Sequence, residues 1–303
     1  MTTADGLSVA RDNDVEFAVS ARGVELFRYV YAADLPRFEC PSPYFHPLRT
    51  LAGDVVTANR PNDHRWHKGL AMTASHVSGQ NFWGGGTYVR GAPGSGYVDL
   101  PNVGSLRHRE FSELTVTDRL RVAESVDWIS SDGQKWIEES RTFEVAVADD
   151  SWSIDFATVL RNVRGTELEF GSPTVFGREL AGYCGFFWRG PRSFTGGAVY
   201  ASDGRCGQEL MGAASPWLAY VGEHDEVDHH STLLFLDHPA NNVPSGRWFV
   251  RSTPFPAVNP SLAFFEPLLL PAGDALSVRY RVVIADGAWD RDALESYVRG
   301  VRW

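Results

Sequence analysis

Long apolar runs and closely spaced cysteines are both missing from this chain of 303 residues. No window of about 18 apolar residues occurs, so we expect no membrane-spanning helix and no membrane partner. The three cysteines, Cys40, Cys184 and Cys206, are far apart, which indicates reduced thiols rather than a disulfide framework or a zinc ribbon. The N-terminal residues form neither a basic nor an apolar stretch, so no secretory signal is predicted and we expect a cytoplasmic protein.

An excess of basic residues is also absent, because 28 Lys and Arg oppose 38 Asp and Glu for a formal net charge of -10. Nucleic acid is therefore not expected as a partner, since phosphate binding needs a basic face. Helical periodicity is scarce. Aromatic residues are abundant at 13%, and with 29 Gly and 17 Pro they favour an all-β architecture. Aromatic rings also suit sugar binding, because they stack on flat apolar sugar faces, although a β core uses the same residues.

Apolar and polar residues alternate with a period of two along many segments, which predicts half-buried antiparallel strands. In one such segment, Leu114, Val116, Leu120 and Val122 would share a face. The pair Asp132-Gly133 predicts a hairpin turn, because glycine supplies the positive φ that such turns need. Further strands are predicted at 15–20, 24–31, 136–147, 152–156, 231–237, 247–251 and 276–284.

Only the C-terminal region has a helical pattern. Asp290 is a good N-cap, apolar residues follow at spacings of three and four from Leu294 to Val298, and Gly300 is a stop. We expect this short helix to pack on a sheet. Together these patterns predict an all-β fold, a single large antiparallel β-sandwich domain over residues 1–303 with one short C-terminal helix.

Three of the nine histidines, His46, His64 and His67, lie in one short stretch. Histidine is the side chain best suited to move protons or bind a metal near neutral pH. His64 and His67 would point to opposite faces of a regular strand, but Pro61-Asn62-Asp63 before them indicates a turn, in which both could converge. The helical zinc-protease pattern is absent. Acid–base chemistry and metal binding both stay open, and the structural alternative is that one ring caps a turn while the other packs on Trp66.

A second group of candidates follows a predicted strand that ends near Asp237. Asp237 could orient His238 or act as a base, and loops at strand ends commonly carry functional residues. The structural alternative is a turn that ends the strand before Pro239. Trp248 and Arg251 on the next predicted strand are three residues apart, so they should point to opposite faces unless a bulge intervenes.

A third candidate is Glu179, in a glycine-flanked stretch that ends at Arg189. A carboxylate held in such a loop can act as an acid or a base. The structural alternative is a surface glutamate paired with an arginine, which contributes little. No Gly-x-Ser-x-Gly elbow occurs, so nothing supports Ser/His/Asp catalysis.

Seven stretches of the chain form a recognisable series, in this order: Tyr44–Thr50, Gly53–Thr57, Asp63–Leu70, Val77–Trp83, Gly171–Arg189, Phe235–Asn241, and Trp248 with Arg251. Together they resemble the bacterial family labelled PmoA-like, or "methane oxygenase PmoA". The resemblance implies a large supersandwich similar to galactose mutarotases and related sugar-active enzymes, and a place in sugar catabolism. A membrane-embedded monooxygenase is not implied, because the chain has no membrane span. The chain has Trp66 where many members have histidine.

The leading hypothesis is a carbohydrate-active enzyme that uses acid–base chemistry on a sugar or keto-sugar glycoside, by hydrolysis, elimination or epimerisation. Acid and base roles are assigned to His64, His67, Glu179, Asp237 and His238. Substrate-binding roles are assigned to His46, Arg49, Asn81, Trp83, Arg189, Asn241, Trp248 and Arg251.

Two alternatives stay open. The first is a metal-dependent enzyme in which two or three of His46, His64, His67 and His238 bind zinc, manganese or copper. The second is a non-catalytic module that binds a sugar. The sequence assigns no cofactor, although a divalent metal fits the first alternative, and it leaves a homo-oligomer open.

Overall fold

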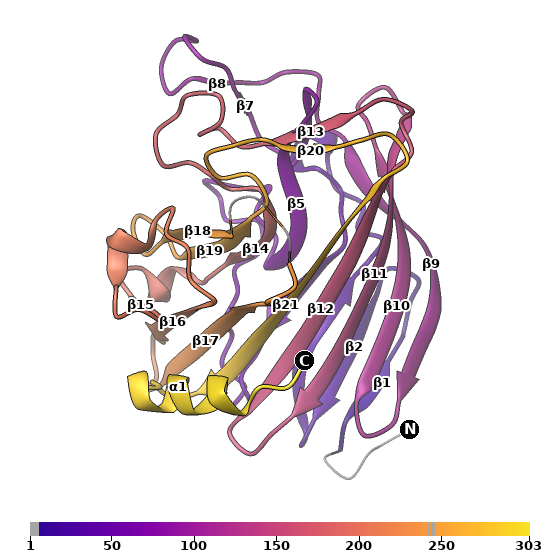
Figure 1. Ribbon diagram of the computed structural model, residues 1–303. Coiled ribbons are helices and arrows are strands. Elements are labelled where there is room, and N and C mark those ends of the chain that lie inside the picture. The colour runs from indigo at the N-terminus through magenta and orange to yellow at the C-terminus, as the bar shows by residue number, and fades with distance from the viewer. Residues whose placement is uncertain (1–5, 242, 244–245) are drawn as a thin grey trace.

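Two antiparallel β-sheets lie face to face in the computed structural model, which describes residues 6–241, 243 and 246–303 (Figure 1). Within these residues the larger sheet has eleven strands and the smaller has eight, and a two-stranded sheet lies beside them. The expected all-β sandwich with a short C-terminal helix is confirmed. No helix among the described residues is long and apolar enough to cross a membrane.

The eleven-stranded sheet, called the site sheet below, has the main strand order β1-β2-β3-β4-β5-β14-β19-β18. Strands β6 and β13 pair with β5, and β20 pairs with β13. The bounds are β1 Ser8–Ala10, β2 Glu16–Ala21, β3 Val24–Val30, β4 Tyr44–Leu48, β5 Leu70–Val77, β6 Gln80–Phe82, β13 Leu168–Gly171, β14 Gly185–Arg189, β18 Arg247–Arg251, β19 Ala257–Ser261 and β20 Leu268–Leu270.

The eight-stranded sheet, called the back sheet, has the order β15-β16-β17-β21-β12-β11-β10-β9. Its bounds are β9 Ser105–Val116, β10 Leu120–Ile129, β11 Lys135–Val147, β12 Ser151–Asn162, β15 Ala198–Ala201, β16 Trp217–Glu223, β17 His230–Asp237 and β21 Ala275–Asp286. The remaining elements are the hairpin strands β7 Thr87–Tyr88 and β8 Tyr97–Val98, the 3-10 helices η1 Arg37–Glu39, η2 Arg192–Phe194 and η3 Gly207–Leu210, and the helix α1 Arg291–Gly300.

The space between the two sheets is filled by aromatic side chains from both. Phe27 of the site sheet stacks on Trp152 of the back sheet with ring centroids 5.5 Å apart. Phe186 of the site sheet stacks on Phe156 at 4.2 Å and on Tyr280 at 5.9 Å. The alternation within β12 and β21 thus places one residue in two in this core, as the sequence predicted.

The helix α1 starts where the sequence predicted. The Asp290 carboxylate accepts a hydrogen bond from the Ala293 N–H at 2.9 Å, which caps the first turn. The buried Leu294 packs with Trp217, Leu234 and Val283, which lie on the outer face of the back sheet. The prediction that this helix packs on a sheet is therefore confirmed (Figure 1).

One predicted strand is wrong in its extent. The residues from Leu114 to Val122 belong to two strands, β9 and β10, joined by a turn. Leu114 pairs with Val122, and Val116 pairs with Leu120, across the hairpin. Cross-strand partners point to the same face of a sheet, so the apolar alternation continues through the turn and hides it.

Candidate functional site

A second group of aromatic residues lies on the face of the site sheet that points away from the core. In β14, Phe186 and Trp188 point into the core, so Phe187 between them points outward. In β18, Trp248 points into the core and Phe249 outward. Arg251 shares the outward face with Phe249, and the predicted opposite orientation of Trp248 and Arg251 is confirmed.

Two successive turns bring His64 and His67 together at the edge of this outward face. The His64 N–H donates to the Pro61 carbonyl at 3.0 Å, and the His67 N–H donates to the His64 carbonyl at 2.9 Å. The two imidazole rings stack with centroids 4.7 Å apart. Phe255 packs against both rings, at 4.9 Å from His64 and 5.7 Å from His67. The convergence of the two histidines in a turn is thus confirmed.

A glycine-rich loop supports this edge of the site. Gly84 and Gly85 have φ of +97° and +69°, and a Cβ on Gly85 would lie 2.5 Å from the Trp66 ring, so the ring can approach only a glycine. Asn81 holds the loop in place. Its side-chain oxygen accepts from the N–H groups of Trp83 at 2.8 Å and Gly84 at 2.9 Å, and its amide donates to the Gly85 carbonyl at 3.1 Å.

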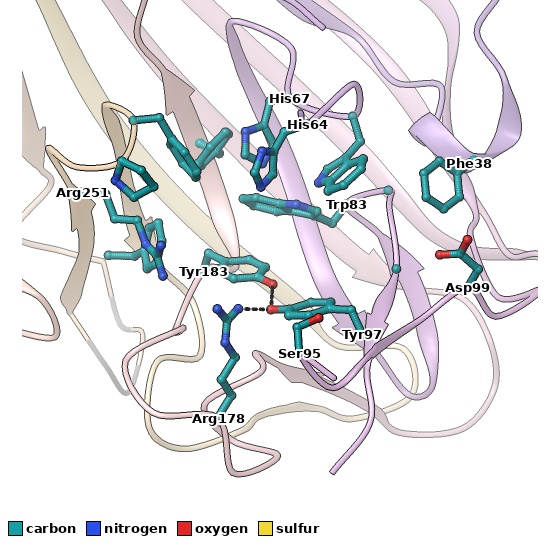
Figure 2. Close-up of a pocket in the computed structure, with 17 residues that line it drawn as sticks. Phe38, His64, His67, Trp83, Ser95, Tyr97, Asp99, Arg178, Tyr183 and Arg251 are labelled. Carbon is teal, nitrogen blue, oxygen red and sulfur yellow. Dashed lines mark hydrogen bonds between the residues drawn. The ribbon is translucent and has the colours of Figure 1, made fainter. Parts of the chain in front are cut away.

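These elements enclose a cavity of about 460 Å³, within the range for small-molecule sites, shown in Figure 2. Its walls are mostly aromatic, and its polar side chains are two histidines, two arginines, two tyrosines, one serine and one aspartate. The lining consists of Phe38, His64, Trp66, His67, Trp83, Gly84, Gly86, Ser95, Tyr97, Asp99, Arg178, Tyr183, Phe187, Phe249, Arg251, Pro254 and Phe255.

His67 is held as a neutral ring by Arg189 behind it. Arg189 is 1% exposed, and its Nη1 lies 3.0 Å from the His67 Nδ1. A guanidinium can only donate, so Nδ1 must accept, and the ring proton is assigned to Nε2. Burial, reinforced by the charges of His64 and Arg189, lowers the pKa of His67 well below its ordinary value. His67 is therefore a neutral hydrogen-bond donor.

His64 has the opposite arrangement. The Asp63 carboxylate oxygen lies 3.1 Å from the His64 Nδ1, at ion-pair distance but without the geometry of a hydrogen bond. Its negative charge favours a proton on the nearby Nδ1, which leaves a lone pair on Nε2. Burial lowers the pKa of His64 although Asp63 opposes the shift. At neutral pH His64 is thus an uncharged ring with a lone pair, as a general base requires.

Two arginines give the cavity a positive charge. Arg178 donates from Nη1 to the Tyr97 hydroxyl, which also contacts the Tyr183 hydroxyl (Figure 2). Burial, and then the charge of Arg178, lowers the pKa of Arg251. Among the lining residues that the structure describes, Asp99 is the one carboxylate, and no ion pair joins it to either arginine.

Several residues assigned to the site from the sequence lie behind it or away from it. Arg189 and Asn81 support His67 and the glycine loop from behind, and Trp248 lies in the core, where its Nε1 donates to the Ser215 carbonyl at 2.7 Å. His46 contacts the Thr57 hydroxyl at 2.9 Å, and burial lowers its pKa to about 4. The residues assigned to the site that do not line this cavity are His46, Arg49, Asn81, Glu179, Arg189, Asp237, His238, Asn241 and Trp248.

The group around Asp237 lines a different, more open groove of about 540 Å³, together with Trp217 and Trp303. The Asn241 amide donates to the Asp237 carboxylate at 2.6 Å, and the His238 ring packs on Trp303 at 4.6 Å. Burial raises the pKa of Asp237 to about 6. The expected single composite cleft is therefore not what the structure shows: His64, His67, Trp83 and Arg251 share one cavity, and Asp237, His238 and Asn241 share another.

Glu179 is exposed, whereas its neighbour Arg178 points into the cavity. The structure thus places Arg178, rather than the predicted Glu179, in the lining of this cavity. Sequence reasoning also misses Tyr97, Tyr183 and Phe255. A usable signal is present only in β14 and β18, where apolar residues occupy both faces of the strand, which indicates that the outward face is covered as well.

The metal alternative depends on a cluster of donor side chains. Among the residues that the structure describes, no group of three or more His, Cys, Asp or Glu side chains is placed to hold a metal ion. His46 and His238 do not line the cavity that contains His64 and His67. The ligand set that the sequence suggested is thus not assembled in this structure.

Comparison with known proteins gives a family. Residues 16–299 match the model of a family of unknown function, DUF6807. The chain belongs to this family. No curated protein matches it. The resemblance of this DUF6807 chain to PmoA-like proteins stays a prediction.

Solved structures with a similar fold include bacterial α-galactosidases. The GH36 α-galactosidase AgaB of Geobacillus stearothermophilus is 12% identical, with a TM-score of 0.43 over 95% of this chain and 42% of its own. An α-galactosidase of Lactobacillus brevis is 9% identical, with a TM-score of 0.41 over 94% of this chain and 40% of its own. This chain spans less than half of the length of either structure, and likeness at this level carries no conclusion about activity.

Proposed function

We propose that this DUF6807 chain is an enzyme that binds a carbohydrate in the aromatic cavity and moves protons with His64 and His67. The observation that carries the proposal is the stacked histidine pair, in which Asp63 leaves a lone pair on His64 and Arg189 leaves a proton on His67. Perturbed titratable groups in a cavity are the usual mark of a functional site. The aromatic walls suit the apolar faces of a sugar ring.

The histidine pair favours proton transfer next to a carbonyl, as in elimination from a keto-sugar. The His64 Nε2 takes a proton from the carbon beside the carbonyl, and the C–H electron pair moves to form an enolate. The enolate oxygen accepts a hydrogen bond from the His67 N–H. The electron pair then returns and expels the substituent oxygen on the next carbon, which takes the proton from His64. Every step uses groups of the cavity and needs no oxidant.

Hydrolysis by a pair of carboxylates is less well supported by this cavity. That mechanism needs two carboxyl groups beside the bond that breaks. Asp99 is the one carboxylate among the described lining residues, and Glu179 is exposed. Epimerisation needs proton delivery to the second face of the sugar, for which the cavity offers Tyr97 and Tyr183 rather than a carboxylate.

The test is turnover of a panel of sugars by the purified chain. We expect activity on 3-keto-glycosides, measured by release of the substituent, and little on the parent glycosides. His64→Gln should lower kcat by a factor on the order of 10²–10⁴, the usual contribution of a general base. His229→Gln is the matched control, because His229 is exposed and pairs with Asp54 outside the cavity.

A sugar-binding module without catalysis is the second candidate. The mostly aromatic lining favours it, because such walls bind without reacting. It predicts saturable binding with no turnover, and a His64→Gln variant that binds sugar as well as the parent chain does. That result would contradict the proposed enzyme.

A further inference from the structure

We propose that the ligand of this cavity carries an anionic group, a carboxylate or a phosphate, which Arg178 and Arg251 bind together. The inference takes from the proposed function only that the ligand is a sugar. It concerns the arginines of the cavity rather than the histidines and depends on no catalytic step. The ligand class that it names is an acidic sugar, such as a uronate or a sugar phosphate.

Arg251 is the first observation. It projects from β18 beside the rings of Phe249 and Phe255, with the guanidinium carbon 5.4 Å and 5.9 Å from their centroids. Its Nε is buried and has no hydrogen-bond partner among the described residues. None of the ion pairs found between described residues includes Arg251. Arg251 as a whole is half-buried, and withdrawing a guanidinium even partly from water without a counter-charge is costly, so a ligand that supplies the charge is expected.

Arg178 is the second observation. It comes from the loop after β13, far from Arg251 in the sequence, and its guanidinium lies 4.9 Å from the centre of the Tyr97 ring. Its Nη1 is fixed on the Tyr97 hydroxyl, which leaves the other donors of the fork free to meet a ligand. Fixing one donor orders the side chain in advance, which lowers the entropy cost of binding.

The two guanidiniums are also close enough for the charge of Arg178 to act on Arg251. Like charges repel, so an anion bound between the two guanidiniums would relieve this repulsion. Figure 2 shows Asp99 on the opposite side of the cavity from Arg251, where it does not neutralise the pair. The two planar guanidiniums suit a carboxylate or a phosphate, because the oxygens of these anions accept several charge-assisted hydrogen bonds.

The experiment compares matched sugars by isothermal titration calorimetry on the full chain. D-galacturonate is compared with D-galactose, and D-glucose 6-phosphate with D-glucose. We expect at least one acidic sugar to bind roughly 10- to 100-fold more tightly than its neutral partner, because charge-assisted hydrogen bonds are the strong ones. The two pairs distinguish a carboxylate from a phosphate as the preferred group.

Arg178→Gln and Arg251→Gln should each abolish this preference, while Arg251→Lys should keep some of it because the charge remains. Arg161→Gln is the matched control, since Arg161 is exposed on β12 and does not line the cavity. A melting curve for each variant shows that it is folded.

Equal affinity for the acidic and neutral sugars, or an acidic preference that survives both arginine substitutions, would overturn the inference. The two proposals fail separately. Acidic sugars that bind but are never turned over would remove the enzyme and keep the anion subsite. Turnover of neutral sugars, with no preference for acidic sugars, would keep the enzyme and remove the anion subsite.

Discussion

Two regions of this molecule place an arginine among aromatic rings, fully buried in one region and half-buried in the other, and they differ in whether its charge is paired. In the core network, Arg141 is 1% exposed and its fork meets the Glu139 carboxylate at 2.8 and 3.0 Å. The third nitrogen donates to the Tyr29 hydroxyl at 2.9 Å. In the cavity, Arg251 has no such carboxylate among the described residues and keeps a buried Nε without a partner.

The pairing in the core network extends beyond the arginine. Glu139 also accepts from Trp128 at 2.7 Å and from the Thr158 hydroxyl at 2.9 Å. Glu124 contacts His108 at 2.7 Å and accepts from Tyr29. The core network consists of Tyr29, His108, Glu124, Trp128, Glu139, Arg141 and Thr158.

The difference shows which polar cluster belongs to the scaffold. A buried charge must be paired, and the core network finds its partners within the chain, so it has no need of a ligand. Arg251 keeps a donor without a partner among the described residues, which is what the proposed anion subsite requires. Burial and charge alone therefore do not identify a functional site, whereas an unpaired charged donor that also lines a cavity supports one.

The largest expected effect on stability comes from a substitution that breaks the core network. Arg141→Met leaves the carboxylates of Glu139 and Glu124 buried without their cation, so we expect a loss of about 3–5 kcal/mol in the free energy of unfolding. Urea unfolding followed by tryptophan fluorescence measures it. The control Arg161→Met, at an exposed position, should change stability by about 0.5 kcal/mol or less. A similarly small effect of Arg141→Met would mean that the network does not stabilise the fold.

A smaller effect concerns pH and the neutral state of His67. Its pKa in the folded chain lies well below the value near 6.5 expected when unfolded, so the unfolded chain binds a proton as the pH falls through that range and the folded ring does not. Stability is therefore lost on acidification. His67→Gln should remove on the order of 1–2 kcal/mol of the stability lost between pH 7 and pH 5. The measurement is urea unfolding at both pH values.

An unchanged pH dependence in the His67→Gln variant would contradict the neutral assignment. A direct check is nitrogen-15 NMR of the histidine rings, in which His67 should show its proton on Nε2. That tautomer follows from the donor on Arg189, since a guanidinium cannot accept.

The fold could be predicted largely from the sequence, because each long strand carries its own alternation. Residues 276–284 lie within β21, and the Asp132-Gly133 turn joins β10 to β11, as predicted. The turn between β9 and β10 was hidden because its two strands keep the apolar residues in phase. The alternation of apolar and polar residues thus predicts where strands lie, but it does not predict every turn between them.

The site could be predicted only where its residues are neighbours in sequence. His64 and His67 converge through two local turns, which their own segment encodes. Asp237 ends β17 in the back sheet, whereas the histidine turn leads into β5 of the site sheet. Which sheet a strand joins depends on its pairing with strands far away in the sequence. The residues near Asp237 therefore do not indicate that β17 belongs to the back sheet. The same limit concealed Tyr97 and Arg178, which reach the cavity from the hairpin strand β8 and from the loop after β13.

The smallest expected change in stability gives the sharpest test of the comparison. Arg251→Met keeps the length of the side chain and its packing on Phe249 and Phe255 but removes a charge that has no carboxylate partner among the described residues. We expect the free energy of unfolding without ligand to stay within about 1 kcal/mol of the parent value, or to rise, because replacing an uncompensated buried charge by an apolar group is favourable. Measured beside Arg141→Met in the same urea series, this variant separates the two regions. A loss as large as that of Arg141→Met would show that Arg251 already has a partner within the chain, and the distinction between the scaffold and the ligand site would then fail at the residue on which it depends most.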